Sequence, residues 1–352
     1  MMKQSAFSIA LLSALLFGAA TPISKPLLDH LTPFQLAGLL YLGAALGVVI
    51  IILRERNFKA PWHLDRRNRL RLLGAVLFGG VLGPLALLAG LNMALAASVS
   101  MWLNLEMVAT AILGHFIFKD HLSRTGWIAA GGILVAAIIL AAGEGLAGIQ
   151  AGILVAAACL CWSIDNHLTA LIDGISPAQS TFWKGLVAGS TNLLIGISLA
   201  PLGGSLASVL GGLALGTAAY GLSIVLYISS AQQLGATRSQ LVFSSAPFWG
   251  VFLSIVLLGE RLGWLHGIAA VIFMVSIVVL FLEKHAHHHT HAAMNHHHLH
   301  HHTDEHHQHD HQGISPTDRH SHSHDHDPLQ HDHKHLPDLH HRHLHKNSNE
   351  TP

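Results

Sequence analysis

Apolar stretches of about 20 residues recur along residues 1–284, with short polar connections between them. A helix of roughly 20 apolar residues is long enough to cross the hydrocarbon core of a bilayer. Because the stretches keep this length and contain few charges, they predict an all-α polytopic membrane protein with ten transmembrane helices. The predicted helices lie near 7–27, 33–53, 72–90, 96–117, 125–142, 149–171, 177–200, 208–229, 237–258 and 263–282.

The composition of the chain also favours a membrane protein. Hydrophobic residues make up 51% of it and charged residues 11%, which leaves too little polar surface for a soluble protein. The lipid bilayer is therefore an expected partner. No glycine-rich phosphate loop, His-Glu-x-x-His motif or nucleophile motif occurs, so we do not expect an enzyme. Nucleic acid is not an expected partner, because membrane topology explains the one basic run.

That basic run, at 54–71, carries seven Lys or Arg residues. Short connections rich in Lys and Arg stay on the cytoplasmic side of a membrane. Counting ten spans from this connection places the N-terminus and the C-terminal tail on the cytoplasmic side as well. We therefore expect a multi-pass protein of the cell (inner) membrane with both ends inside.

The two halves of the chain repeat each other. Thr32-Pro33-Phe34-Gln35 opens the second predicted helix, and Ser176-Pro177-Ala178-Gln179 opens the seventh. Phe118-Lys119-Asp120-His121-Leu122 and Leu258-Gly259-Glu260-Arg261-Leu262 form a second matching pair of connections. Each half has five spans, an odd number, so the halves must lie in opposite orientation, as in transporters built from inverted repeats. The predicted units are 1–144, 145–284 and a tail at 285–352.

Several of these motifs resemble those of the EamA-type transporters in the drug/metabolite transporter superfamily. The resemblance rests on the order and spacing of Phe17-Gly18, Pro22, Lys25, Pro247 and the Gly259-Glu260-Arg261-Leu262 turn within five plus five helices. It covers residues 5–284 and implies export or exchange of a small metabolite, without naming the metabolite. The first repeat departs from the pattern at Asp120 and at Met107, so the corresponding features are not carried over there.

Glu106 is the ionisable residue predicted to lie deepest in the membrane. It is about 12 residues from the cytoplasmic end of its helix, or roughly 18 Å, and an ionisable group at that depth is a functional candidate by default. Side chains four residues apart share a helix face, so two polar faces could line a wet path for substrate or protons. The alternative is a structural hydrogen bond of protonated Glu106. The candidate residues are Trp102, Glu106 and Thr110 beside Ser98 on one helix, and Tyr220 and Tyr227 beside Thr217 and Ser223 on another.

Asp165 and Lys184 form a second intramembrane candidate. Both are expected roughly 9 to 10 Å inside the cytoplasmic face, on consecutive helices, where they could pair as a structural ion pair or as a gate that opens during transport. Cys161 lies four residues before Asp165, and His167 lies nearby, so a transition-metal site is a weaker alternative.

Histidine dominates the tail, which holds 26 of the 32 histidines of the chain between His285 and His345. Bulky apolar residues are scarce there, so the tail is predicted to be disordered. Imidazole is the commonest ligand for divalent transition metals, and binding of Zn, Ni or Co is predicted; a response to pH and an inert extension are the alternatives. The candidate ligands are His287, His288, His289, His291, His296, His297, His298, His300, His301, His302, His320, His322, His324 and His326.

Three functional hypotheses follow. The first is a secondary transporter of a small-molecule substrate, with a tail that binds divalent metal ions for regulation or delivery and with no required cofactor. The alternatives are a divalent metal efflux transporter proper, and a membrane-anchored protein that buffers or senses metal. Ten spans in an inverted repeat argue against a mere anchor, because one helix would suffice. The sequence specifies no substrate, transport direction, coupling ion or oligomeric state.

Overall fold

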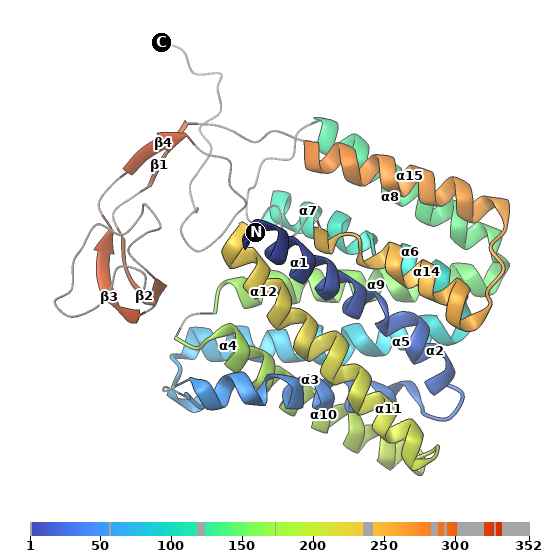
Figure 1. Cartoon of the computed structure of the whole chain (residues 1–352), viewed down its shortest axis with the longest axis horizontal. Helices are drawn as coiled ribbons and strands as arrows, with labels where there is room; N and C mark the ends of the chain where they lie inside the picture. The colour runs from blue at the N-terminus through green and yellow to red at the C-terminus, as the bar shows by residue number, and fades with distance from the viewer. Residues whose placement is uncertain are drawn as a thin grey trace.

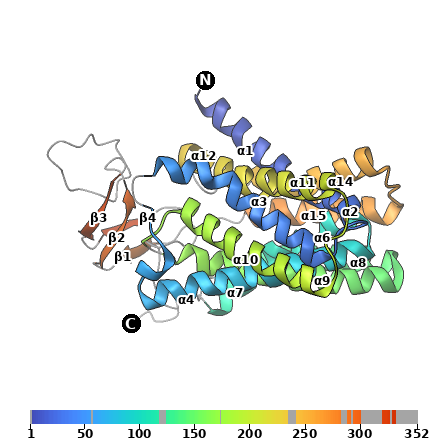
Figure 2. The ribbon, with the colours of Figure 1, turned by 90° about the horizontal axis from the view of Figure 1, so that it is seen from below.

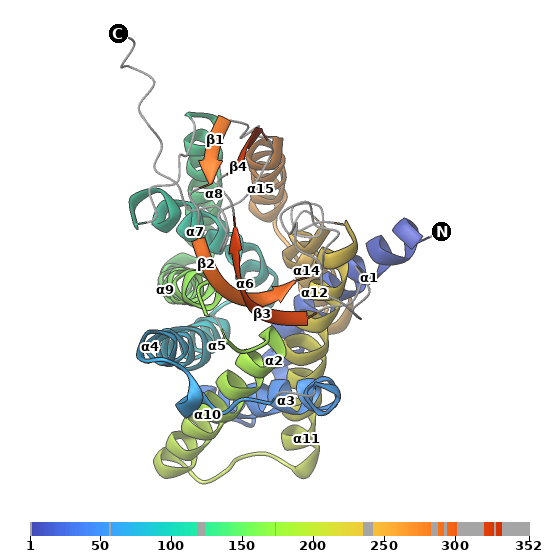
Figure 3. The ribbon, with the colours of Figure 1, turned by 90° about the vertical axis from the view of Figure 1, so that its left-hand side faces the viewer.

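The computed structural model describes residues 2–55, 58–117, 124–172, 174–234 and 242–282, together with the backbone of four short strands in the tail. The helices lie side by side along the long axis of the molecule (Figure 1). Figure 3 views the bundle from one end, where the helices are seen nearly end-on.

The first half of the chain contains eight α-helices and two short segments of other helix types among the residues described. Their bounds are α1 Met2–Gly18, α2 Ala20–Leu27, α3 Pro33–Arg54, η1 Pro61–His63, α4 Arg66–Ala75, η2 Val76–Leu82, α5 Gly83–Met93, α6 Ala96–Trp102, α7 Leu105–Ile117 and α8 Arg124–Gly143. The second half continues with α9 Gly145–Ala170, α10 Pro177–Leu199, α11 Leu206–Gly216, η3 Thr217–Leu222, α12 Ser223–Leu234, α14 Ala246–Leu258 and α15 Trp264–Leu282.

Seven helical stretches among the described residues are long and apolar enough to cross a membrane, in agreement with the predicted polytopic protein. They are Ala6–Leu27, Pro33–Arg54, Arg66–Met93, Ala96–Phe116, Arg124–Gly143, Gly145–Ala170 and Leu206–Ser230. Two shorter apolar helices, Ala246–Leu258 and Trp264–Val279, follow. The remaining long helix, α10, has 23 residues and carries Lys184 within it.

Several of these stretches are irregular near their middle. The segments η2 and η3 are π-helical and interrupt the stretches Arg66–Met93 and Leu206–Ser230. A turn at 103–104 separates α6 from α7, and another at 244–245 precedes α14. Such interruptions release backbone carbonyls from the helical hydrogen-bond ladder and often mark functional sites. They concentrate the irregular backbone inside the bundle.

Helices α3 and α10 pack against each other over their whole length. At Gly185 an added Cβ atom would lie 2.7 Å from the Tyr41 carbonyl oxygen and 3.0 Å from the Ala45 nitrogen, so only glycine permits this approach. Small residues let helix backbones come close, and this contact drives association in membranes. The closely packed helices α3 and α10 therefore form one side of the centre of the bundle.

The repeated Thr/Ser-Pro-x-Gln motifs lock the two ends of this helix pair. Thr32 caps α3 and Ser176 caps α10, each accepting the backbone N–H of the glutamine three residues later. Gln35 Nε2 then donates to the carbonyls of Ala200 and Pro201 at 3.1 and 3.0 Å. At the other end Gln179 Nε2 donates to a carboxylate oxygen of Glu55 at 2.6 Å. The two matching motifs therefore connect α3 to α10 by hydrogen bonds at opposite ends of the helix pair.

The basic segment 54–71 is not a connection throughout, contrary to the sequence interpretation. Helix α4 begins at Arg66, because the Asp65 carboxylate accepts the backbone N–H groups of Arg67 and Asn68 at 2.9 and 3.2 Å. The hydrogen bond from the Asn68 side chain is the main reason that the pKa of the exposed Asp65 lies below its ordinary value. Part of the basic charge thus lies on the first turns of a helix.

Four short strands lie in the tail segments that the structure describes, and the predicted disorder of the tail stays a prediction. Strands β1 His288–His291 and β4 Leu329–Asp332 pair antiparallel, as do β2 Met294–His300 and β3 His320–His326. Figure 2 shows these strands outside the helical bundle. In β3 histidine alternates with serine or aspartate, and this period of two suits an extended strand. The rest of the tail lies outside the described residues.

Candidate functional site

An ion pair joins α9 to α10 inside the bundle. Lys184 Nζ lies 2.7 Å from Asp165 Oδ2, and both side chains are largely buried, with exposed fractions of 16% and 7%. Thr169 Oγ1 donates to the other carboxylate oxygen of Asp165 at 2.9 Å. Both oxygens of Asp165 are thus engaged, as a buried carboxylate requires. The two residues that the sequence suggested as partners do meet in the structure.

The π-helical segment η2 packs against this pair. The Gly79 carbonyl accepts hydrogen bonds from the Tyr41 hydroxyl and, at 3.1 Å, from Trp162 Nε1. Asn192 Nδ2 donates to the Gly80 carbonyl at 3.0 Å. Asp165 lies directly against Gly79, where any side chain would collide with its carboxylate. The irregular backbone therefore supplies acceptors to three neighbouring helices and makes room for Asp165.

Glu106 lies in the first turn of α7, just after the break between α6 and α7. Its Oε1 accepts a hydrogen bond from Asn166 Nδ2 at 2.7 Å. Although it is enclosed by helices, its side chain remains partly exposed. It also interacts electrostatically with Asp165 and Lys184. We name these four residues, Glu106, Asp165, Asn166 and Lys184, the central cluster.

The central cluster holds two carboxylates and one ammonium group. In the described part of the chain Lys184 makes its ion pair with Asp165, and no cation forms an ion pair with Glu106. An ionised carboxylate without a partner is costly at membrane depth. Glu106 must therefore be neutral, wetted or paired with a bound cation or substrate group.

A row of aromatic rings extends from the central cluster. Tyr41 and Tyr220 have ring centroids 5.7 Å apart, and Phe17 lies 5.8 Å from Tyr220. Tyr227 is farther along and contacts Phe243 at 5.0 Å. Sequence analysis had identified Tyr220 and Tyr227 but missed Tyr41, a single phenol in the mostly apolar helix α3. These rings offer hydroxyl and apolar surface next to the charged groups.

The predicted polar faces are not continuous in the structure. Trp102 is fully buried and donates from Nε1 to the Ala137 carbonyl at 3.1 Å, so it packs between helices and does not line a path. Ser98 instead bonds to Glu144, and Thr110 is partly exposed on α7. The break at 103–104 separates these positions, and an unbroken helix was the mistaken assumption.

The facing helix also uses its polar groups for packing. Thr217 Oγ1 donates to the Gly43 carbonyl at 2.9 Å. Ser223 Oγ donates to the Ser13 carbonyl at 3.0 Å. Hydroxyl groups that bond to a neighbouring backbone hold membrane helices together. On this predicted face, Tyr220 lies beside Tyr41 and interacts electrostatically with Glu106 of the central cluster.

The alternative metal site within the membrane does not form. His167 Nδ1 lies 2.7 Å from the Ser163 carbonyl, and Asp165 is occupied by Lys184. No group of three His, Cys, Asp or Glu residues in the described part of the chain could hold a metal ion. Cys161, the cysteine of this alternative, is a free thiol that is partly exposed.

Most candidate ligands of the tail fall on its strands. The register pairs His296 with His324, His298 with His322, and His300 with His320, as backbone partners on β2 and β3. The remaining candidates on described strands are His288, His289 and His291 on β1, His297 on β2 and His326 on β3. His287, His301 and His302 lie outside the described residues.

A second polar cluster lies at the end of the bundle opposite to α4. Sequence analysis had noted only its Gly259-Glu260 turn. Glu260 accepts the N–H groups of Ala96 and Ala97 at 2.8 and 2.9 Å. His266 Nε2 lies 3.1 Å from Ser98 Oγ and 3.7 Å from Glu144 Oε1. Burial raises the pKa of Glu144, but hydrogen bonds from His266, Ser98 and the Leu95 N–H outweigh it and hold the pKa below its ordinary value.

Both halves of the chain match one known protein family. The model of the EamA-like transporter family matches the chain twice, at residues 4–142 and 150–282. An uncharacterized transporter of Methanothermobacter thermautotrophicus (strain ATCC 29096 / DSM 1053 / JCM 10044 / NBRC 100330 / Delta H) is 23% identical over 291 residues, which span 76% of this chain and 84% of the relative. A protein of known crystal structure is similar at 18% identity with a TM-score of 0.57, over 79% of this chain and 97% of its own.

Proposed function

The chain belongs to the EamA-like transporter family and is a multi-pass membrane transporter, not an enzyme; from this premise we propose that it is a secondary transporter of a small polar solute handled at the central cluster. The observation that carries the proposal is the pair of carboxylates around one ammonium group, Glu106 and Asp165 with Lys184. Such groups are retained inside a membrane where they bind substrate or relay protons.

The proposed architecture is ten spans in a five-plus-five inverted repeat, with units 1–144 and 145–284. The family model matches each half once. The π-helical segments η2 and η3 interrupt the third stretch of each half, and the Thr/Ser-Pro-x-Gln motifs open the second. Inverted repeats place the solute site at their interface, beside interrupted helices. The central cluster supports this location, because Glu106 comes from the first unit and Asp165, Asn166 and Lys184 from the second.

In the proposed mechanism the two carboxylates compete for Lys184. While Glu106 is protonated or bound to a solute, Asp165 keeps the ammonium group to itself. When Glu106 becomes ionised, it attracts Lys184 and weakens the existing pair, which joins α9 to α10. The break before Glu106 and the irregular segment η2 allow the backbone to follow. Occupancy of Glu106 thereby changes the packing of the helices, and this is what alternating access requires.

The orientation we propose places both ends and the basic segment 54–71 in the cytoplasm, because Lys and Arg collect on that side. Reporter fusions at Asp29 and Glu144 are then expected to report the outside, and a fusion after Lys284 the inside. Alkaline phosphatase and green fluorescent protein fusions measure the two sides independently. An external signal from the fusion after Lys284 would reverse the position of the tail.

We further propose that the tail binds several divalent Zn, Ni or Co ions. Its density of imidazoles supports this, as does the histidine-to-histidine register of β2 and β3. Binding requires neutral imidazole, so it should weaken as the pH falls below the ordinary histidine pKa of about 6.5. The tail would then report metal to the transporter or deliver it, while the helical domain moves the solute.

One experiment in vesicles tests the solute and the tail together. The full chain and a form ending at residue 283 are reconstituted, and uptake of a panel of small organic solutes and of divalent metals is measured at neutral pH and at pH 5.5. We expect both forms to move the same organic solute, and Zn²⁺ or Ni²⁺ to change the rate of the full chain alone, at neutral pH alone.

Other results separate the alternatives. Equal metal uptake by both forms, without uptake of any organic solute, would support a metal efflux transporter. Metal retention by the full chain without any transport would support an anchored metal buffer. Identical behaviour of both forms with every metal would remove the metal function from the tail.

A further inference from the structure

The second polar cluster lies where α5 passes into α6. We name its four side chains, Ser98, Glu144, Glu260 and His266, the end cluster. Glu144 lies between α8 and α9, Glu260 in the turn before α15, and His266 on α15. They meet at the start of α6, although Ser98 and His266 are 168 residues apart in the chain. The end cluster therefore joins the first half of the chain to the second.

Two carboxylates hold the start of α6. Glu260 accepts the backbone N–H groups of the first two residues of the helix, one on each oxygen. Glu144 Oε2 accepts the N–H of Leu95 at 3.3 Å, and its other oxygen accepts the hydroxyl of Ser98. The first N–H groups of a helix have no partner within the helix, so here residues from distant elements satisfy them. The position of α6 therefore depends on these two carboxylates.

His266 is held less completely than the two carboxylates. Because Ser98 donates its proton to Glu144, it accepts a hydrogen bond from His266 Nε2 at 3.1 Å. His266 Nδ1 is buried and has no hydrogen-bond partner among the residues that the structure describes. A buried polar atom without a partner costs free energy that contact with water would recover. Opening of this end would hydrate Nδ1, and this lowers the free energy needed to separate the cluster.

A pocket of about 370 Å³ opens beside the end cluster. Its lining is Lys25, Asn92, Met93, Ala94, Leu95 and Glu144. Ser100 lies on the other side of the cluster, one turn farther along α6 than Ala96, and is only 1% exposed. The end cluster therefore separates a recess of the surface from the buried interior.

Helix α6 connects the end cluster to the central cluster. It has seven residues, or about 10 Å of helix. It ends at the turn 103–104, directly before the first turn of α7, which carries Glu106. A short helix between two irregular points can move as one rigid unit, with the adjoining turns as hinges. Release of α6 at the end cluster would therefore move Glu106.

We propose that the end cluster is a gate, in which Glu144 and Glu260 position α6 so that this end of the solute path is closed. The gate opens when the start of α6 leaves the two carboxylates. Alternating access needs one end that closes while the other opens, and this inference rests on the proposed transport function. It adds the side chains that close one end and the helix that relays the closure to Glu106. In the proposed orientation the gate faces outward.

The test labels one cysteine behind the gate with a membrane-impermeant maleimide. Ser100 suits this purpose, because its buried Oγ has no hydrogen-bond partner in the described part of the chain and S100C breaks no bond there. The parent protein is the full chain with S100C, in which Ala replaces Cys159 and Cys161. Labelling is measured in intact cells and in inverted membrane vesicles, which expose opposite faces. We expect the parent to label slowly from the gate side, and E144A/E260A to label at least tenfold faster from that side.

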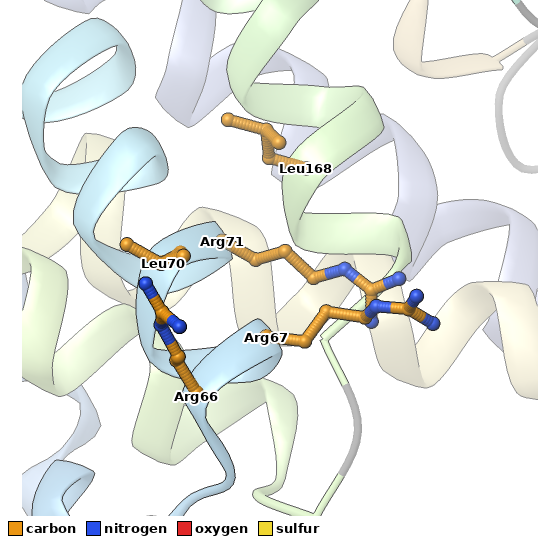
Figure 4. A pocket seen from close by; sticks show the side chains of 5 residues that line it. All are labelled: Arg66, Arg67, Leu70, Arg71 and Leu168. Carbon is orange, nitrogen blue, oxygen red and sulfur yellow. The ribbon is translucent and has the colours of Figure 1, made fainter.

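Two accessible positions calibrate the labelling from each side. M93C, in the pocket outside the gate, should label rapidly from the gate side. L168C should label rapidly from the opposite side, because Leu168 lines a pocket of about 440 Å³ at the start of α4. Figure 4 shows this second pocket, whose lining is Arg66, Arg67, Leu70, Arg71 and Leu168.

E55A is the matched control for the loss of a carboxylate. Glu55 accepts hydrogen bonds from Ser176 and Gln179 at the end of the bundle opposite to the gate, so the parent with E55A should still label slowly from the gate side. E144Q/E260Q keeps one acceptor oxygen on each side chain and should label at a rate between those of the parent and E144A/E260A. Melting temperatures show whether each variant is folded, and if E144A/E260A does not fold, the same comparison is made with E144Q/E260Q.

Contrary results would overturn the gate without involving any solute. Equal labelling of the parent and of the folded gate variants would mean that Glu144 and Glu260 do not close this end. Equal acceleration by E55A would indicate a general loosening of the bundle, which also removes the gate. If gate variants label faster from the gate side alone while vesicles move no solute, the closure stands and the proposed transport function fails.

Discussion

Replacing Glu106 by Gln is expected to abolish or uncouple solute transport while the protein still inserts and folds. Gln keeps the shape of the side chain and an oxygen that can accept the hydrogen bond from Asn166, but it cannot ionise. A hydrogen bond to a charged group contributes about 1.5–3 kcal/mol, so transport should fall at least about tenfold. The measurement is uptake into vesicles across a range of pH, with the folded fraction followed in parallel.

Two matched variants sharpen this result. E106D keeps the charge on a shorter side chain and should retain part of the transport and its dependence on pH. T110A changes a partly exposed polar residue one turn farther along α7 and should have a smaller effect. If E106Q transports normally and with the same pH dependence as the unaltered protein, Glu106 has only a structural role.

The second large effect is expected on folding, from the Asp165 and Lys184 pair. Removing one partner of a buried ion pair leaves an uncompensated charge, which costs about 3–5 kcal/mol. D165N and K184M should therefore each lower the free energy of unfolding strongly. The double variant should lose less than the sum of the two, because neither charge is then left unpaired. Unfolding in detergent measures all three, and K59M, an exposed lysine outside the cluster, is the control.

The double variant also separates a gate from a structural pair. A folded D165N/K184M protein that still transports would show that the pair serves packing alone. A folded protein that binds solute but does not transport it would show that the pair must break and reform. Additive losses of stability, by contrast, would mean that the two side chains do not contact each other in the folded protein.

Local features of this protein could be read from the sequence. The apolar stretches predicted most of the helices to within a few residues, because burial in lipid leaves a continuous signal along the chain. Thr32 and Ser176 marked helix starts, since capping involves only the next three residues. Glu106, Asp165 and Lys184 were conspicuous for a similar reason: an ionisable side chain within an apolar stretch is costly and rare.

Only the tertiary structure brought those residues together. Depth along separate helices had placed Glu106 apart from Asp165 and Lys184, whereas the fold joins them through Asn166 and through their mutual electrostatic interaction. The helix break at 103–104 and the segment η2 arise where packing overrides regular geometry. Neither the helix break nor η2 produces a sequence pattern as strong as the hydropathy pattern of a membrane-spanning helix.

Packing between helices that are distant in the sequence also explains the other differences between prediction and structure. Trp102 is buried, and Glu144 meets His266, because the rotation of each helix about its axis is set by neighbours distant in the chain. Tyr41 joins the centre for the same reason. The sequence by itself determined which segments enter the membrane and which ionisable groups enter with them. Which of those groups meet was decided by helix packing, since contacts between residues far apart in sequence leave no periodic trace along the chain.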